Sequence, residues 1–119
     1  MQLKYQADII LLDTIRQSKM NDYYKIFYSL AESYVEEMIR ALPQRSEAEN
    51  NKTERRKAIF IAGKKLRELE VFVSRLNPNL ESIMGASLPD NVGVLARLAL
   101  ELVYSTKPEI FESKYPQTI

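Results

Sequence analysis

Apolar residues in the middle of the chain recur at alternating steps of three and four. The stripe consists of Ile59, Ala62, Leu66, Leu69, Val73 and Leu76. This spacing places them on one side of a helix that must face a partner. Asn51 with Glu54 forms a capping-box pattern at the start. Asn77-Pro78 predicts the end, because the residue before a proline is disfavoured in helical conformation. We therefore expect a helix over residues 51–76, with Leu66 at its buried centre, and a short further turn of helix over residues 79–85.

A second long helix is predicted over residues 22–42, with Asn21 or Asp22 as its N-cap. One face carries an apolar stripe of Tyr23, Phe27, Leu30, Tyr34, Met38 and Leu42. Tyrosine rings can cover a core while their hydroxyls reach water, so the core margin is their expected place, and a binding surface is the alternative. Pro43 ends this helix, and the polar residues 43–50 predict an exposed loop.

Two further helices are predicted near the ends of the chain, over residues 6–18 and 90–106. Residues 87–90 are typical of a capped entry into the later one, whose wide apolar face indicates contact on two sides. The tail from residue 107 carries Ile110, Phe111 and Tyr115, and is either a docking segment or a frayed end. We predict an all-α fold, an antiparallel bundle of four main helices, with residues 1–119 as a single helical domain.

Composition excludes several classes of chemistry. The 119 residues include no cysteine and no histidine, so disulfides, thiolate catalysis, histidine bases and histidine metal sites are absent. The net charge of +1 gives no global attraction to nucleic acid. No apolar run reaches the ~18–20 residues of a membrane span, and Asp8 and Asp13 interrupt the N-terminal apolar patch, unlike a signal peptide. We expect a soluble, cytoplasmic protein that does not enter a membrane.

One hypothesis for the acidic residues Glu32, Glu36 and Glu37 is a helical magnesium-dependent hydrolase. Such a site needs carboxylates three residues apart on one helix and a second acidic pair on another. Position 35 is Val, and the last helix offers only Asp90 and Glu101. A solvated acidic face explains the pattern better. We predict no catalytic, metal-binding or cofactor-binding residues, no cofactor, and no enzymatic activity.

Basic residues concentrate around the central helix. Residues 44–76 contain nine basic and five acidic side chains, whereas residues 21–42 contain two and four. The candidate contacts to an acidic partner or to phosphate are Arg55, Arg56, Lys57, Lys64, Lys65 and Arg67. Their directions are scattered around the helix, and the aromatic residues nearby, Phe60 and Phe72, are expected to be buried. Non-specific nucleic-acid binding and a solvated face with internal ion pairs both stay open.

A second apolar edge accompanies the main stripe of the central helix, at Phe60, Ile61, Val71 and Phe72. Four helices cannot easily bury every such group in one small core. This edge indicates either a partner protein or a C-terminal tail that covers it. The expected partners are proteins, including other copies of this chain.

The layout resembles the helical domain of GINS subunits, small proteins of the archaeal and eukaryotic replicative helicase assembly. The similar segments are LLDTIRQSKM, NDYYKIFYSLAESYVEEMIRAL, TERRKAIFIAGKKLREL and the Leu88-Pro89 entry to the final helix. GINS subunits usually add a small β domain, for which this chain shows no strand pattern.

The resemblance implies a GINS-like bundle that acts as a non-enzymatic replication scaffold. Its implied partners are other GINS-like subunits and helicase components, and its implied location is the nucleoid. Within that interpretation, Tyr23, Tyr24 and Phe27 anchor the bundle, and the basic residues meet acidic neighbours or DNA. The alternative is a small helical protein that binds nucleic acid through residues 52–76.

Overall fold

The computed structural model describes residues 5–42 and 52–114, and every regular element in these two ranges is a helix. The elements are α1 (Gln6–Arg16), α2 (Asn21–Ala41), α3 (Lys52–Met84), α4 (Val92–Thr106) and α5 (Glu109–Lys114). The predicted all-α bundle of four main helices is confirmed, and the tail contributes a short fifth helix. The predicted loop over residues 43–50 lies outside the described residues.

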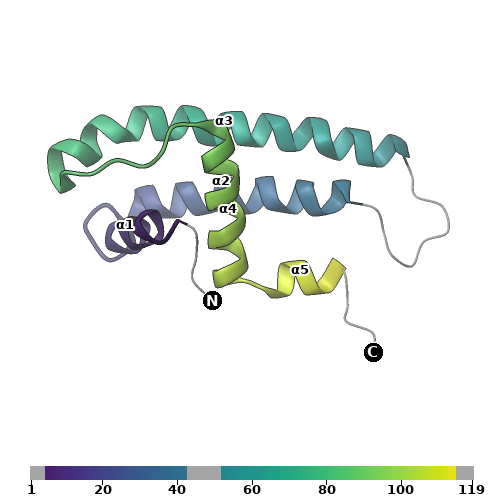
Figure 1. Cartoon of the computed structure of the whole chain (residues 1–119), viewed down its shortest axis with the longest axis horizontal. Coiled ribbons are helices and arrows are strands. Elements are labelled where there is room, and N and C mark those ends of the chain that lie inside the picture. The colour runs from purple at the N-terminus through teal and green to yellow at the C-terminus, as the bar shows by residue number, and fades with distance from the viewer. Residues whose placement is uncertain (1–4, 43–51, 115–119) are drawn as a thin grey trace.

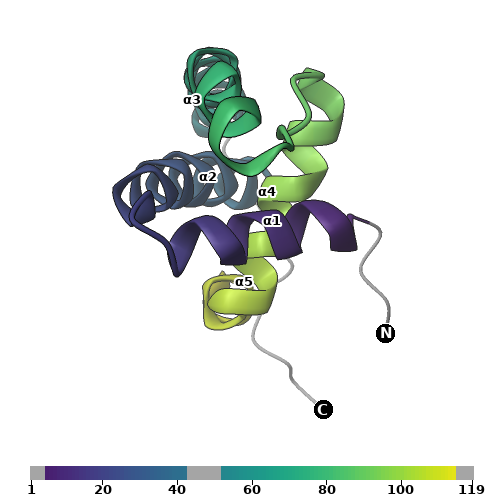
Figure 2. The same ribbon diagram turned by 90° about the vertical axis from the view of Figure 1, so that its left-hand side faces the viewer.

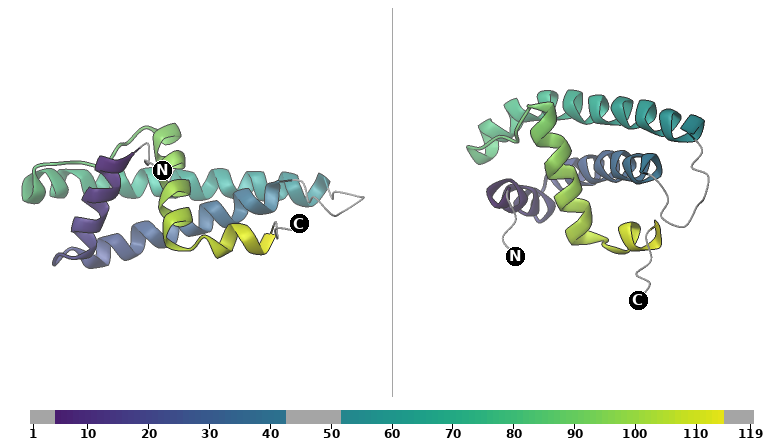
Figure 3. Two further views of the ribbon diagram at one scale, coloured as in Figure 1. Left: turned by 60° about the horizontal axis from the view of Figure 1, so that its bottom comes forward. Right: turned by 45° about the vertical axis from the view of Figure 1, so that its right-hand side comes forward.

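The two long helices, α2 and α3, run antiparallel along the molecule (Figure 1). Helix α4 crosses both of them, as the view along the long helices also shows (Figure 2). Helix α1 crosses the start of α2, and α5 lies beyond the end of α4 (Figure 3). Helix α2 contacts each of the other four helices, so it is the centre of the bundle.

The core is formed mainly by aliphatic side chains around α2. Phe27, Ala31 and Val35 of α2 are fully buried. Helix α4 contributes the buried residues Leu95, Leu98, Ala99, Leu102 and Val103, which confirms the wide apolar face expected for the last helix. Tyr34 is also buried, and burial raises the pKa of its hydroxyl. No polar or charged residue is fully buried in the described ranges.

The buried stripe of α3 differs from the predicted one at two positions. It consists of Ala58, Ala62, Leu69, Val73, Leu76 and Leu80. Ile59 is 56% exposed, and Leu66 is half-buried at the core margin rather than at its centre. Two small alanines, Ala58 and Ala62, form the start of the stripe. Because neighbouring helical positions differ by about 100°, a stripe through Ala58 turns Ile59 outward.

Helix α3 does not end at Asn77, as Pro78 had predicted, but continues to Met84 (Figure 1). An interior proline costs a helix about 3 kcal/mol. Leu76 and Leu80 are both buried on either side of it, and each buried leucine contributes about 1.5–3 kcal/mol. Pro78 itself is exposed, so its ring displaces no core side chain. The helix ends instead before Gly85, whose positive φ of 67° suits glycine.

The helix starts also differ from the predicted caps. Helix α2 follows Met20 and has no side-chain cap, and the Ser18 hydroxyl accepts from the Met20 N–H at 3.0 Å. Helix α4 starts at Val92, two residues later than predicted. There the Asn91 side chain accepts from the N–H groups of the second and third residues of α4. The predicted capping box at Asn51 lies outside the described residues.

Candidate interaction surface on helix α3

The side of α3 opposite its buried stripe carries exposed apolar and basic side chains together. We call this the outer face of α3, defined by Arg56, Phe60, Lys64, Arg67 and Val71, all of which are exposed. Steps of three and four residues align them along one side of the helix. Nothing in the described part of the chain packs over them.

Phe60 is the most informative residue of this surface, because it was expected to be buried and is 64% exposed. The Lys64 Nζ lies 4.7 Å from the centroid of its ring, within the range of a cation–π contact. The second expected buried aromatic, Phe72, is half-buried against the core. The prediction of burial was therefore wrong for Phe60, since the buried stripe turns position 60 toward solvent.

A shallow hollow lies over Gly63, between Phe60 and Arg67, and is also lined by Ile59, Lys64 and Glu68. A Cβ added at Gly63 would meet no atom within 4 Å. The helix backbone is therefore accessible at this point. A partner side chain can approach it closely, with an apolar wall on one side and basic groups on the other.

The six predicted contact residues separate into groups with different surroundings. Arg55 donates from Nε to the Ala41 carbonyl at 3.1 Å, which joins the start of α3 to the end of α2. Lys65 is half-buried beside the core stripe, and its Nζ lies 3.9 Å from Glu68. Arg55 therefore has a structural role, and neither residue belongs to the outer face.

The other four predicted residues are exposed. Arg56, Lys64 and Arg67 belong to the outer face, and Lys57 lies at its edge. Lys57 is 3.7 Å from Glu54, and Arg67 is 3.9 Å from Glu70. Both pairs are exposed ion pairs, which are worth about 0–1 kcal/mol. A partner carboxylate or phosphate can therefore replace these acidic neighbours at little cost.

The C-terminal segment does not cover the second apolar edge of α3 within the described residues. Helix α5 contacts α2 and α4, and has no contact with α3. Phe111 of α5 packs edge-on against Tyr104 of α4, with ring centroids 5.3 Å apart. Helix α5 therefore does not cover this edge, and a partner protein stays a prediction.

The acidic side chains of α2 are engaged elsewhere. The Glu32 carboxylate lies 3.1 Å from the Lys107 Nζ, and the Glu37 carboxylate lies 2.6 Å from the Arg40 guanidinium. Burial, followed by the nearby charge of Glu32, raises the pKa of Glu36. No group of three potential metal ligands occurs among the residues that the structure describes.

Comparison with known proteins adds no relative from which a function could be transferred. No protein-family model, curated protein or solved structure matches this chain. In the described ranges, no helix is both long enough and apolar enough to span a bilayer.

Proposed function

We propose that this protein is a non-enzymatic interaction module that binds an acidic partner protein through the outer face of α3. The observation that carries this proposal is the exposed ring of Phe60, flanked by Lys64 and placed opposite the core. Aromatic residues and arginines are enriched at protein interfaces, and a few buried anchors of this kind supply most of the binding energy. Phe60 supplies the apolar anchor, and the basic groups select the charge of the partner.

The charge of α3 supports an acidic partner over a second copy of the same surface. Residues 52–84 contain eight basic and four acidic side chains. Two outer faces packed against each other would bring like charges together, which costs free energy. An acidic protein surface with an exposed apolar residue complements both features of this face.

The finer proposal is that the partner belongs to a replicative helicase assembly. This proposal rests on the resemblance of four segments to GINS subunits. It predicts other GINS-like subunits or helicase components as partners, and a cytoplasmic, nucleoid-associated location. The observed bundle provides the scaffold that such a role requires, but many helical proteins share this architecture.

Nucleic acid is the second candidate partner, through the same residues 52–76. The exposed ring of Phe60 favours it, because a base can stack on an accessible aromatic ring beside basic groups. The two candidates differ in their dependence on salt. Binding to nucleic acid weakens steeply as salt rises, because it releases counterions. Binding dominated by an apolar anchor changes much less.

The deciding experiment compares pull-downs from nuclease-treated native lysate with the wild type and with a Phe60→Ser/Lys64→Glu variant. Partners are identified by mass spectrometry. Ile83→Ser is the matched control, because Ile83 is equally exposed on α3 but lies near its other end. We expect a protein that the wild type and the control retain and the double variant loses. Recovery of helicase components supports the finer proposal.

Two results would contradict the proposal of a protein partner. One is a set of bound proteins that is the same for the wild type and the Phe60→Ser/Lys64→Glu variant. The other is binding that disappears entirely after nuclease treatment and, with purified nucleic acid, falls steeply with salt. The second result would establish the nucleic-acid alternative.

A further inference from the structure

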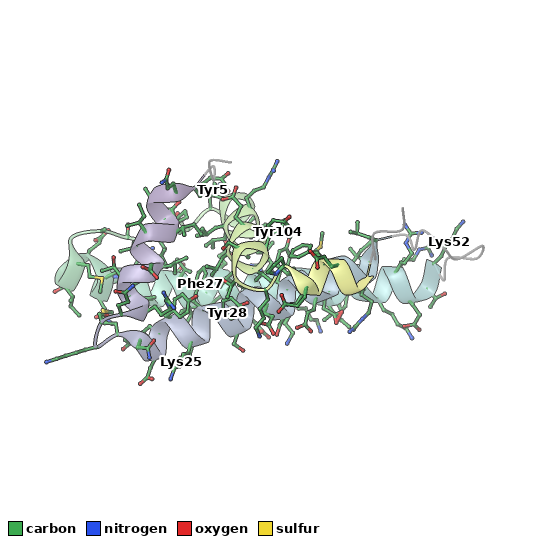
Figure 4. All side chains as sticks on the ribbon, turned by 90° about the horizontal axis from the view of Figure 1, so that it is seen from below. Tyr5, Lys25, Phe27, Tyr28, Lys52 and Tyr104 are labelled. Atoms are coloured by element: carbon green, nitrogen blue, oxygen red, sulfur yellow. The ribbon has the colours of Figure 1, made fainter. Side chains whose placement is uncertain are left out.

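Two adjoining hollows lie where α1, the first half of α2 and the end of α4 meet. Their volumes are about 400 Å³ and 370 Å³, within the range of small-molecule sites. Arg16, Tyr24 and Thr106 line both of them. We call this site the tyrosine cleft, and its key residues are Arg16, Tyr24, Lys25, Tyr28, Glu32 and Lys107. Figure 4 shows this side of the molecule, with Lys25 and Tyr28 labelled on α2.

Two tyrosines one helical turn apart form the aromatic wall of the cleft. The Tyr24 and Tyr28 ring centroids are 6.2 Å apart, and their planes differ by 25°. Each ring also has a cation beside it. The Arg16 guanidinium carbon lies 6.0 Å from the Tyr24 centroid, and the Lys107 Nζ lies 5.7 Å from the Tyr28 centroid. Both distances are near the limit of a cation–π contact, so neither cation is held tightly by the ring.

The charged side chains of the cleft favour an anion. Its larger hollow is lined by Arg16, Lys25 and Lys107 and by one carboxylate, that of Glu32. The smaller hollow is lined by one further carboxylate, that of Asp13, so basic side chains outnumber acidic ones by three to two over the whole cleft. Lys107 neutralises Glu32 at 3.1 Å. Arg16 bonds Asp13 one turn earlier on the same helix, but about half of its side chain remains accessible and its fork has further N–H donors.

The Tyr28 hydroxyl lies in the wall of the cleft, beside the Glu32 carboxylate. Its oxygen is shielded from solvent. Burial is the main reason that the pKa of Tyr28 is raised, and the negative charge of Glu32 is the second. The hydroxyl therefore keeps its proton at neutral pH. Tyr28 therefore adds no negative charge to the wall of the cleft.

We propose that the tyrosine cleft binds a small aromatic anion. Its ring lies on Tyr24 and Tyr28, and its anionic group meets Arg16 and Lys25. Arginine suits a carboxylate or sulfonate because its planar fork can donate two parallel hydrogen bonds. This site is separate from the outer face of α3, so it does not depend on the proposed protein partner.

The test is an amide chemical-shift titration of the isotope-labelled full chain with naphthoate, which combines an aromatic ring and a carboxylate. Naphthalenemethanol supplies the ring without the charge, and acetate supplies the charge without the ring. We expect saturable shifts at the end of α1, in the first half of α2 and at Thr106. Naphthoate should bind about tenfold tighter than naphthalenemethanol, the effect of one charge-assisted hydrogen bond, and acetate should cause no saturable shift.

Variants test the assigned roles. Arg16→Gln should weaken naphthoate binding about tenfold, and Tyr24→Leu, which removes one ring of the aromatic wall, should weaken it several-fold. Arg97→Gln is the matched control, because Arg97 is an exposed arginine of α4 that does not line the cleft. Equal binding of naphthoate and naphthalenemethanol would overturn the proposal. Chemical-shift changes confined to the outer face of α3 would also overturn the proposal. The location of the shifts is measured on the wild type alone.

Discussion

The side chain of Asn77 bonds both backbone groups of Leu88. Its amide donates to the Leu88 carbonyl at 2.9 Å, and its carbonyl oxygen accepts from the Leu88 N–H at 2.9 Å. Asn77 lies next to the proline within α3, and Leu88 is a buried residue of the connection to α4. The pair fixes this connection against the long helix and holds the Leu88 side chain in the core.

Asn77→Asp should destabilise the protein by about 1–3 kcal/mol, because it removes the donor and places a charge against a carbonyl oxygen. The free energy of unfolding is measured by urea denaturation. Asn79→Asp is the control, because Asn79 is exposed in the next part of the same helix. Equal effects of the two substitutions would show that the bonds to Leu88 contribute nothing.

Leu69→Ala and Leu66→Ala should differ clearly. Leu69 is 0% exposed and belongs to the core, so its truncation should cost about 2–5 kcal/mol. Leu66 is half-buried and should cost about 1 kcal/mol, since part of its side chain already meets water. Chemical denaturation of both variants measures the difference. A larger loss for Leu66→Ala would mean that α3 is rotated from the orientation described above.

Gly63→Ala should separate stability from binding. Alanine is favoured over glycine inside a helix by about 0.5–1 kcal/mol, and its methyl group meets no neighbour here. The melting temperature should therefore rise. The same methyl group fills the floor of the hollow beside Phe60, so partner recovery in the pull-down should fall. A variant that is less stable would contradict the open space above Gly63.

Alkaline pH should weaken the fold through the tyrosines of α2. The pKa values of Tyr24, Tyr28 and Tyr34 are all raised, chiefly by burial. Above pH ~10 the unfolded chain releases protons that the folded chain retains, so the free energy of unfolding falls as pH rises. Urea denaturation at a series of pH values measures this slope. Tyr28→Phe should reduce it, and an unchanged slope would contradict the burial of that hydroxyl.

Much of the fold could be predicted from periodicity, and the exceptions have physical causes. The helices were predictable because each carries an apolar stripe that only a helical backbone places on one side. The continuation of α3 through Pro78 could not be predicted in this way. The backbone preference of Asn77-Pro78 opposes a helix there, and the burial of Leu80 outweighs that preference. Chain-distant contacts such as the hydrogen bonds of Asn77 to Leu88 leave no periodic pattern.

Only part of each candidate surface could likewise be predicted from the sequence. The basic character of α3 was visible in its composition, but the exposure of Phe60 depends on the rotation of the helix, whose buried stripe runs through Ala58 and Ala62. In the tyrosine cleft, the spacing of Tyr24 and Tyr28 on one side of a helix is a sequence signal. The position of Lys107 beside Tyr28 could not be predicted, because it depends on the path of α4.

The central position of α2 has a consequence for the order of folding. Its neighbours α1 and α3 are adjacent to it along the chain, so those contacts close short loops, whereas α4 returns to it from a much greater sequence separation. Short-range contacts form with a smaller loss of chain entropy. The folding nucleus should therefore contain α2 with its sequence neighbours, and α4 should dock after the rate-limiting barrier. Truncations in α4 would then accelerate unfolding more than they slow folding.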